Sequence, residues 1–364
     1  MERIIKAAVE RGASDLHIKA GDVFRARIDG VFKPLTKQRL TPEQTKAIAL
    51  QLIPNEADRA RIDSIRDYDC SWGAPGIGRF RVNLLRQRSS FMVVMRAIPF
   101  NVPTIETLAL PKVIGEIAKA ERGLVLVSGP AGNGKSSTIA AMIQQINSTM
   151  SKHVITLENP IEFLHRDIQS SVTQREVGVD TESLKIGMRA ALRQDPDVIF
   201  VSELVDHDVA STMMQAAETG SLVISTFHAP DAASAVGRMV SMFPTEEQEV
   251  ARMRLADALH AVVSQRLLPR ADGGGRIAVV EVLICTPEIR EVIRSRSRAG
   301  ELHSMIEAGK DEHQMQTFDQ HLQELVEQEL ITTETAVAAA SDASIFAPPP
   351  PKRRRTKKKS SSSR

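Results

Sequence analysis

Eight residues near the middle of the chain read Gly129-Pro130-Ala131-Gly132-Asn133-Gly134-Lys135-Ser136. They fit the phosphate-loop pattern GxxxxGK[ST], and they lie between the apolar run LVLVS and a segment of helical period, which is the context that this motif requires. The glycines allow backbone N–H groups to wrap around phosphates, and the N-terminus of the next helix adds a favourable field for negative charge. We expect Lys135 to contact the β and γ phosphates, Ser136 to bind Mg²⁺, and Ser137 to line the same site. The sequence therefore predicts a site for ATP and Mg²⁺.

The segments around this loop predict the fold of the larger part of the chain. Buried-looking strands alternate with segments of helical period, which favours a mainly parallel sheet covered on both faces by helices. The expected strands are GLVLVSG, HVITLEN, DVIFVSE, SLVISTFH and IAVVEVLI, and the expected helices are 135–150, 181–194, 206–219 and 246–266, followed by shorter ones near 287–297, 301–308 and 317–329. The fold class is α/β.

The first hundred residues have a different pattern. One helical face over residues 2–12 is followed by alternating strands, with a hairpin turn expected at Asp29-Gly30. Thr41 and Gln44 form a capping box for a second helix, and three further strands follow. These features predict a smaller α+β domain, and Pro99, Pro103 and Pro111 mark residues 99–111 as an extended linker. A length of 364 residues is consistent with two domains.

Charge separates the end of the chain from the remainder. The net charge is +2, but residues 348–364 carry eight of the 47 basic residues and no acid, so the remainder has 39 basic against 45 acidic residues, a net of −6. This Pro-rich basic tail is predicted to be disordered; it either binds anionic lipid, nucleic acid or an acidic partner, or serves only as a solvated tail. No apolar run is long enough to cross a bilayer, and the start of the chain lacks the apolar core of a signal peptide, so we expect a cytoplasmic protein.

Hydrolysis of ATP requires a group that orients and deprotonates water, and acidic side chains at strand ends are the candidates. HVITLENPIEF supplies Glu158 and Glu162, and DPDVIFVSE ends in Glu203. A third strand, SLVISTFH, brings Thr226 and His228 to the edge where ligands of open α/β sheets bind. An isolated acid at a strand end is more often structural, but a phosphate loop in the same sheet favours a catalytic role. A lone histidine at a strand end is also more often structural; the functional alternative for His228 is to sense the γ phosphate.

The whole pattern resembles the type IV pilus retraction motors, the PilT and PilU branch of the secretion ATPase superfamily. The resemblance covers nearly all of residues 1–342 and is carried by GIGRFRVN, the phosphate loop, LENPIEF, QREVGVDTES, ALRQDPDVI, AAETG, STFHA, MFP and MQTFDQ. It implies a PAS-like N-terminal domain (1–98), the linker (99–111), a RecA-like ATPase domain (112–342) and the tail (343–364). It also implies a cytoplasmic homo-hexamer at the inner face of the membrane that acts on a pilus platform protein, in some systems with a paralogous motor. QREVGVDTES, AVVEVL and MQTFDQ favour the PilU-like side.

The resemblance also assigns roles residue by residue. It places Lys135 and Ser136 in the Walker A site, makes Glu162 the base that activates water, and has Glu203 close Walker B and support the metal, directly or through water. His228 matches the second histidine of the histidine box. The arginines expected to face the nucleotide are Arg79, Arg81, Arg96 and Arg238.

Four residues depart from the family pattern, and we expect them to cluster near the active site. Asn159 replaces an aspartate, Ser202 a glycine, Val205 an arginine, and Ser221 the first histidine of the box. Since Lys135, Ser136, Glu162 and Glu203 are present, hydrolysis is expected to persist, while its rate and its coupling between subunits stay open.

Three alternatives remain open from the sequence. An assembly or secretion ATPase would usually carry an added N-terminal domain and often a four-cysteine zinc module, whereas this chain has only two cysteines. A nucleotide-binding accessory subunit with weak hydrolysis is consistent with three of the departures, Asn159, Ser202 and Ser221. A nucleic-acid motor is supported only by the basic tail, because the remainder is net negative and has few aromatic residues, so no specific nucleic acid is expected.

Overall fold

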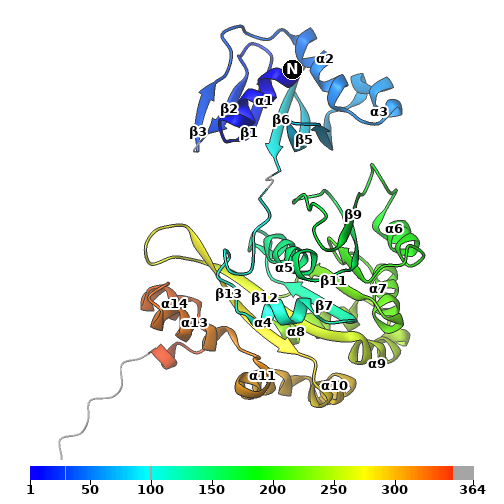
Figure 1. Cartoon of the computed structure of the whole chain (residues 1–364), viewed down its shortest axis with the longest axis vertical. Helices are drawn as coiled ribbons and strands as arrows, with labels where there is room; N and C mark the ends of the chain where they lie inside the picture. The colour runs from blue at the N-terminus through cyan, green and yellow to red at the C-terminus, as the bar shows by residue number, and fades with distance from the viewer. Residues whose placement is uncertain (29, 99–100, 347–364) are drawn as a thin grey trace, which may run out of the picture.

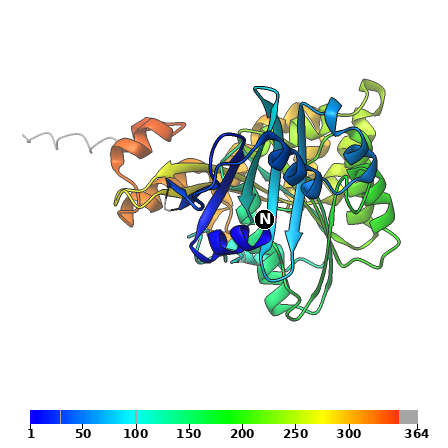
Figure 2. The same cartoon turned by 90° about the horizontal axis from the view of Figure 1, so that it is seen from above.

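The computed structural model describes residues 1–28, 30–98 and 101–346. Two sheets organise these residues, a six-stranded sheet near the N-terminus and a seven-stranded sheet in the remainder (Figure 1). Seen from above, the N-terminal sheet lies over the core (Figure 2). Asp29 of the expected hairpin turn, Pro99 and the tail 348–364 lie outside the described residues.

The N-terminal sheet is antiparallel, with the order β3-β2-β1-β6-β5-β4. Side chains alternate along its central strands: Phe80 and Val82 are buried against the helices, while Arg79 and Arg81 lie on the opposite face. This alternation follows from the two-residue period of a strand. Its elements are α1 (Glu2–Glu10), β1 (Ala13–Lys19), β2 (Arg25–Ile28), β3 (Val31–Pro34), α2 (Pro42–Leu52), α3 (Glu56–Ala60), β4 (Asp67–Ala74), β5 (Gly78–Gln87) and β6 (Ser90–Ala97).

The core sheet has the order β13-β12-β7-β11-β10-β8-β9, and every neighbouring pair is parallel except β12 and β13. Its strands are β7 (Gly123–Ser128), β8 (His153–Glu158), β9 (Ser171–Glu176), β10 (Val198–Val201), β11 (Leu222–Phe227), β12 (Leu259–Pro269) and β13 (Arg276–Ile284). The central strands β7, β10 and β11 are buried along their whole length, as expected for a sheet covered on both faces. The predicted α/β class is confirmed.

Two layers of helices cover the core sheet. One apolar cluster joins one face of the sheet to α6 (Leu184–Ala191), α7 (His207–Thr219), α8 (Ala232–Ser241) and α9 (Gln248–Ala258). A second cluster joins the other face to α4 (Val113–Ala118) and α5 (Lys135–Thr149). The chain continues through α10 (Pro287–Arg294), α11 (Leu302–Ala308), α12 (Lys310–His313), α13 (Phe318–Glu327) and α14 (Thr333–Ala339), and α13 packs on β13. No helix among the described residues combines the length and apolar character needed to cross a membrane.

The helix expected over 246–266 is wrong in its second half. α9 ends at Ala258, and β12 begins at Leu259 and pairs with β7 on one side and β13 on the other. Val262 and Val263 are β-branched and buried, and pairing with a strand on each side outweighs the helical spacing of the apolar residues. The sequence interpretation also missed β9, because its residues are largely polar at the edge of the sheet.

The segment expected as an extended linker packs on the core in part. Ile105 and Leu110 are buried in the cluster of α4 and α5, and Leu108 N donates a hydrogen bond to Thr104 O across a turn. This part of the segment packs on the core because Ile105 and Leu110 are apolar and bury their side chains in the cluster that they share with α4 and α5. The domain boundaries at 98, 111 and 342 and the PAS-like character of the N-terminal unit stay predictions.

Candidate active site

Four parallel strands end at one edge of the core sheet. The phosphate loop follows β7, the acidic segment 158–162 follows β8, Ser202 and Glu203 follow β10, and His228 follows β11. Because the strands are parallel and adjacent, their carboxyl ends deliver these side chains to one crevice. The sequence predicted this convergence.

Strand β12 supports the phosphate loop from one side. Gly129 has φ +141°, and a Cβ there would clash with the backbone carbonyl oxygen of Gln265. Gln265 also donates through Nε2 to Asn133 O at 2.7 Å, and Asn133 Oδ1 accepts from Leu267 N at 2.9 Å. Gln265 was missed by sequence reasoning because its segment was interpreted as helix.

The side chain of Lys135 is hydrogen-bonded to backbone carbonyl groups of the phosphate loop. Its Nζ donates to Gly129 O at 2.8 Å and to Pro130 O at 2.9 Å. Burial lowers the pKa of Lys135, and the nearby carboxylates of Glu203 and Glu162 oppose that change. Within the described part of the chain, no hydrogen bond is donated by the backbone N–H groups of residues 132–134. These N–H groups and the buried ammonium fit a polyphosphate.

The acidic segment after β8 meets the first turn of α5. Ser136 Oγ donates to Glu162 Oε1 at 3.0 Å. Glu162 N in turn donates to Glu158 Oε2 at 3.4 Å, and Ile161 N donates to Glu176 Oε2 at 3.2 Å. Two buried carboxylates therefore fix the backbone on which Glu162 stands.

Glu203 and His228 form a looser pair. His228 Nε2 lies 3.4 Å from Glu203 Oε1, and both side chains are about half exposed, at 54% for His228 and 51% for Glu203. Arg238 Nη1 donates to His228 O at 2.8 Å, which joins α8 to the end of β11. The structure thus brings Glu203, His228 and Arg238 together on the open side of the crevice.

Two further polar atoms, which the sequence did not single out as a pair, line a small cavity beside Glu162. The cavity is about 30 Å³ and is lined by Ser136, Glu158, Glu162, His165 and Ser202, among others. Ser202 Oγ and His165 Nδ1 are buried and have no hydrogen-bond partner within the described residues. Burial lowers the pKa of His165 to about 4. A space of this size with several polar walls accommodates a water molecule.

One of the four departures is distant from the site. Ser221 precedes Leu222, the first residue of β11, and its Oγ donates to Pro196 O at 3.0 Å. His228 follows the other end of the same strand. The expectation that Ser221 clusters near the active site is therefore wrong, because one full strand separates the two positions. Asn159 lines a hollow beside the acidic segment, together with Arg81.

The three arginines of the N-terminal sheet share one face but differ in their contacts. Arg81 and Arg96 are directly opposite on β5 and β6. Arg79 Nη2 donates to Glu176 Oε2 of the core at 2.8 Å, whereas Arg96 is 74% exposed and pairs with Asp15 of its own sheet at 2.9 Å. Their roles at the nucleotide stay predictions.

Oxygen ligands are available for a magnesium ion at the crevice. Among the described residues no group of three or more His, Cys, Asp or Glu side chains is arranged to hold a metal. Mg²⁺ in nucleotide sites takes one or two protein oxygens and completes its shell with phosphates and water. The Ser136 hydroxyl with two nearby carboxylates fits that requirement.

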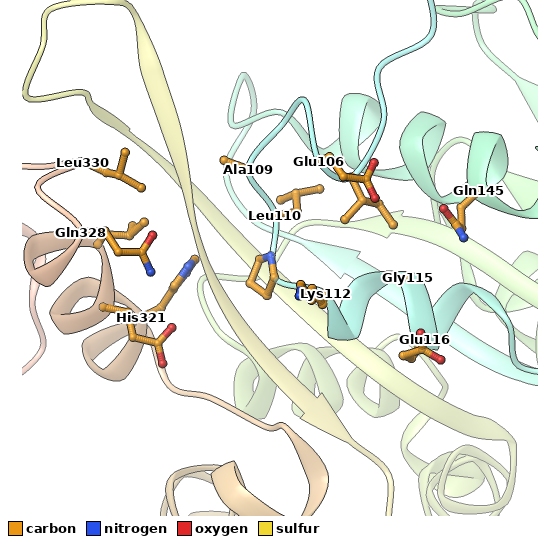
Figure 3. Close-up of a pocket in the computed structure, with 14 residues that line it drawn as sticks. Glu106, Ala109, Leu110, Lys112, Gly115, Glu116, Gln145, His321, Gln328 and Leu330 are labelled. Carbon is orange, nitrogen blue, oxygen red and sulfur yellow. The ribbon is translucent and has the colours of Figure 1, made fainter.

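A larger hollow lies away from this crevice. It has a volume of about 550 Å³ and is formed by the segment before α4, by α4 and α5, and by α13, with Lys112, Glu116 and His321 among its walls (Figure 3). None of the predicted site residues lines it.

Fold and site together define a P-loop ATPase with a RecA-like core. The profile of the type II/IV secretion system protein family matches residues 1–274. The type IV pilus ATPase PilU of Pseudomonas aeruginosa is 40% identical over 93% of this chain and 87% of its own length. The type IV pilus retraction ATPase PilT of the same organism is 39% identical over 92% of this chain and 96% of its own length. A crystal structure of the pilus retraction motor PilT with bound ADP superposes with a TM-score of 0.83 at 43% identity, covering 94% of this chain and 97% of that one.

The chain therefore belongs to the type II/IV secretion ATPase family and, within it, to the type IV pilus ATPases, and it is an ATPase. The family membership that the sequence motifs indicated is confirmed. Identities of 40% and 39% do not separate the PilU-like from the PilT-like side, so that preference stays a prediction.

Proposed function

We propose that this ATPase is a motor of type IV pilus retraction. The observation that carries the proposal is the contact of Ser136 with Glu162 at 3.0 Å beside Lys135, because it joins the phosphate loop to a carboxylate that can act on water. The proposed task, pilus retraction, is taken from the two relatives that are named as a retraction motor and a retraction ATPase.

In this proposal Glu162 is the general base. ATP with Mg²⁺ would supply the electrophilic γ phosphate, and Ser136 with Glu203 would hold the metal. Lys135 exchanges its bonds to Gly129 O and Pro130 O for the phosphates, and Glu162 leaves Ser136 to accept the proton of the attacking water. His228, beside Glu203, responds to the presence of the γ phosphate.

The base of the nucleotide occupies the hollow next to the loop. This hollow has a volume of about 330 Å³, and its lining includes Gly134, Ser137, Leu108, Leu267 and Arg276. Ser137 lies in the first turn of α5, so it joins the base to the phosphate end of the ligand. The apolar walls suit a planar ring.

We further propose that the active form is a homo-hexamer. Arg81, Arg96 and Arg238 then face the nucleotide when the domains close, and an arginine at the transition state contributes about 10³ to 10⁵ in rate. The ring would act at the cytoplasmic face of the inner membrane on a pilus platform protein, with a paralogous motor where one exists. The basic tail would contact anionic lipid or an acidic partner.

A second candidate is a nucleotide-binding accessory subunit that hydrolyses little alone. The specific observation in its favour is that the side chains of Glu203 and His228 are half exposed and 3.4 Å apart. They lie next to Ser202, one of the residues that differ from the family pattern. It differs from the first candidate in turnover and not in fold.

Steady-state ATPase activity with light scattering separates the two candidates. We expect the purified chain to form hexamers and hydrolyse ATP, and Glu203→Gln to lose at least about tenfold in kcat. Glu218→Gln, which breaks an ion pair with Arg254 away from the crevice, serves as the matched control. A nucleotide-binding ring without turnover would establish the accessory subunit, and stimulation by DNA would favour a nucleic-acid motor.

A further inference from the structure

One carboxylate of the core contacts both the N-terminal sheet and the catalytic segment. Glu176, the last residue of β9, accepts from Arg79 Nη2 at 2.8 Å and from Ile161 N at 3.2 Å. Both bonds end on the same oxygen atom, Oε2. Figure 1 shows β9 on the side of the core toward the N-terminal sheet.

The surroundings make this carboxylate depend on its partners. The side chain of Glu176 is 4% exposed, and the arginine that neutralises it comes from another sheet. A buried carboxylate that loses its counter-ion must take up a proton, gain water or move, because an unpaired buried charge is strongly destabilising. The backbone of Glu176 is fixed independently, since its N–H donates to Asp180 Oδ2 at 2.9 Å. Loss of Arg79 would therefore displace the side chain of Glu176 and weaken the hydrogen bond that this side chain accepts from Ile161 N.

Ile161 directly precedes Glu162 in the chain. The bond from Ile161 N is one of two that anchor this turn to buried carboxylates, and the turn sets where Glu162 meets Ser136. A shift of about 1 Å in a catalytic group can reduce the rate by about 10²-fold.

We propose that Glu176 is a positioning residue that couples docking of the N-terminal sheet, through Arg79, to the placement of Glu162. The inference rests on the proposed role of Glu162. Movement of the N-terminal sheet withdraws Arg79, loosens the Ile161 bond and removes Glu162 from its productive position. Hydrolysis is thereby limited to the closed arrangement of the two sheets.

The arginine retains capacity for a second ligand. Arg79 Nε is buried and has no acceptor within the described residues, while Nη2 contacts Glu176 and Ser71. A guanidinium has five N–H donors in a fixed fork. The N–H at Nε is therefore a buried donor that the ion pair with Glu176 does not use, and the role of Arg79 at a nucleotide phosphate stays a prediction.

Kinetics of Glu176→Gln, Arg79→Gln and the double variant test the coupling in the full chain. The Glu176→Gln change keeps an oxygen for Ile161 but removes the charge that holds Arg79. We expect kcat of Glu176→Gln to fall about tenfold with KM for ATP within about threefold, and the double variant to be no slower than the slower single variant. Glu218→Gln, the control, should leave kcat within about twofold.

A second readout does not depend on turnover. Amide hydrogen exchange over residues 159–163 should accelerate in Arg79→Gln and in Glu176→Gln relative to the wild type, and stay unchanged in Glu218→Gln. Unchanged exchange in Arg79→Gln, or fully additive losses in kcat, would overturn the coupling. A wild type without turnover but with faster exchange in the variants would instead refute the proposed function and retain the contact.

Discussion

The core half of the active site and its N-terminal half differ in how firmly they are held. In the core, Lys135 has two hydrogen bonds to its own loop and Ser136 contacts Glu162 at 3.0 Å. In the N-terminal sheet, Arg96 is 74% exposed and pairs with Asp15 of the same sheet. Arg79 of the same sheet is instead held, at 2.8 Å from buried Glu176 of the core. The difference supports the proposal that the core alone binds the nucleotide, while turnover depends on how the N-terminal sheet closes on it.

The largest expected effect comes from the core half. Lys135→Ala removes the buried ammonium that neutralises the β and γ phosphates, so we expect kcat/KM for ATP to fall by at least about 10²-fold. Hydrolysis at the wild-type rate would show that the phosphate-loop assignment is wrong. Lys152→Ala, which breaks ion pairs with Glu121 and Asp197 away from the crevice, is the matched control and should change kcat/KM little.

A smaller effect, confined to turnover, is expected from the N-terminal half. Arg81→Ala should lower kcat at least about tenfold and leave the Kd for ADP within about threefold, because this arginine contributes only when the sheets close. Arg25→Ala removes an arginine of the same sheet that pairs with Asp22, and it should change neither kcat nor the Kd for ADP. A Kd for ADP that rises as much as kcat falls would place Arg81 in ground-state binding and would remove the contrast between the halves.

Acid should destabilise the core through a buried histidine. His321 accepts a hydrogen bond from Val280 N at Nδ1, and burial lowers its pKa to about 4 from an ordinary 6.5. Between these two pKa values His321 binds a proton in the unfolded chain but not in the folded chain. The contribution of His321 to the free energy of unfolding is therefore fully present above pH 6.5 and falls as the pH drops toward 4. The loss from this group is about 2 kcal/mol at about pH 5. Denaturant unfolding of wild type and His321→Gln at neutral pH and at that acid pH measures it; an equal acid loss in both would exclude His321 as the cause.

The smallest effect is expected at the end of the chain. Deleting residues 348–364 removes eight positive charges but no residue of either half of the site. We expect ATPase activity within about twofold of the wild type and unchanged hexamers by light scattering, because all the predicted site residues precede this segment. Loss of hexamers would show that the tail is part of the assembly.

The sequence predicted the elements whose residues obey local rules. The sequence was sufficient to predict the phosphate loop, the buried strands that lead to Glu203 and His228, and the capping box at Thr41, because each depends on spacing along the chain. β12 was not predicted, since only its pairing with β7 and β13 distinguishes it from a helix.

Distance along the chain explains the residues that sequence reasoning missed. Gln265 and Glu176 bind Asn133 and Arg79, which lie 132 and 97 residues away from them, respectively. No local spacing rule connects such partners. The position of Ser221 was predicted wrongly for a related reason. Its match to the histidine box does not show that Ser221 precedes β11 whereas His228 follows it.

The most direct test of the account measures binding and turnover together in Glu162→Gln. The variant keeps an oxygen for Ser136 but cannot accept a proton, so we predict an ATP Kd within about threefold of the wild type and a kcat reduced at least about 10²-fold. That result would establish Glu162 as the group that turns a preformed nucleotide site into a motor. Turnover near the wild-type rate would contradict the account and transfer the role of base to Glu203.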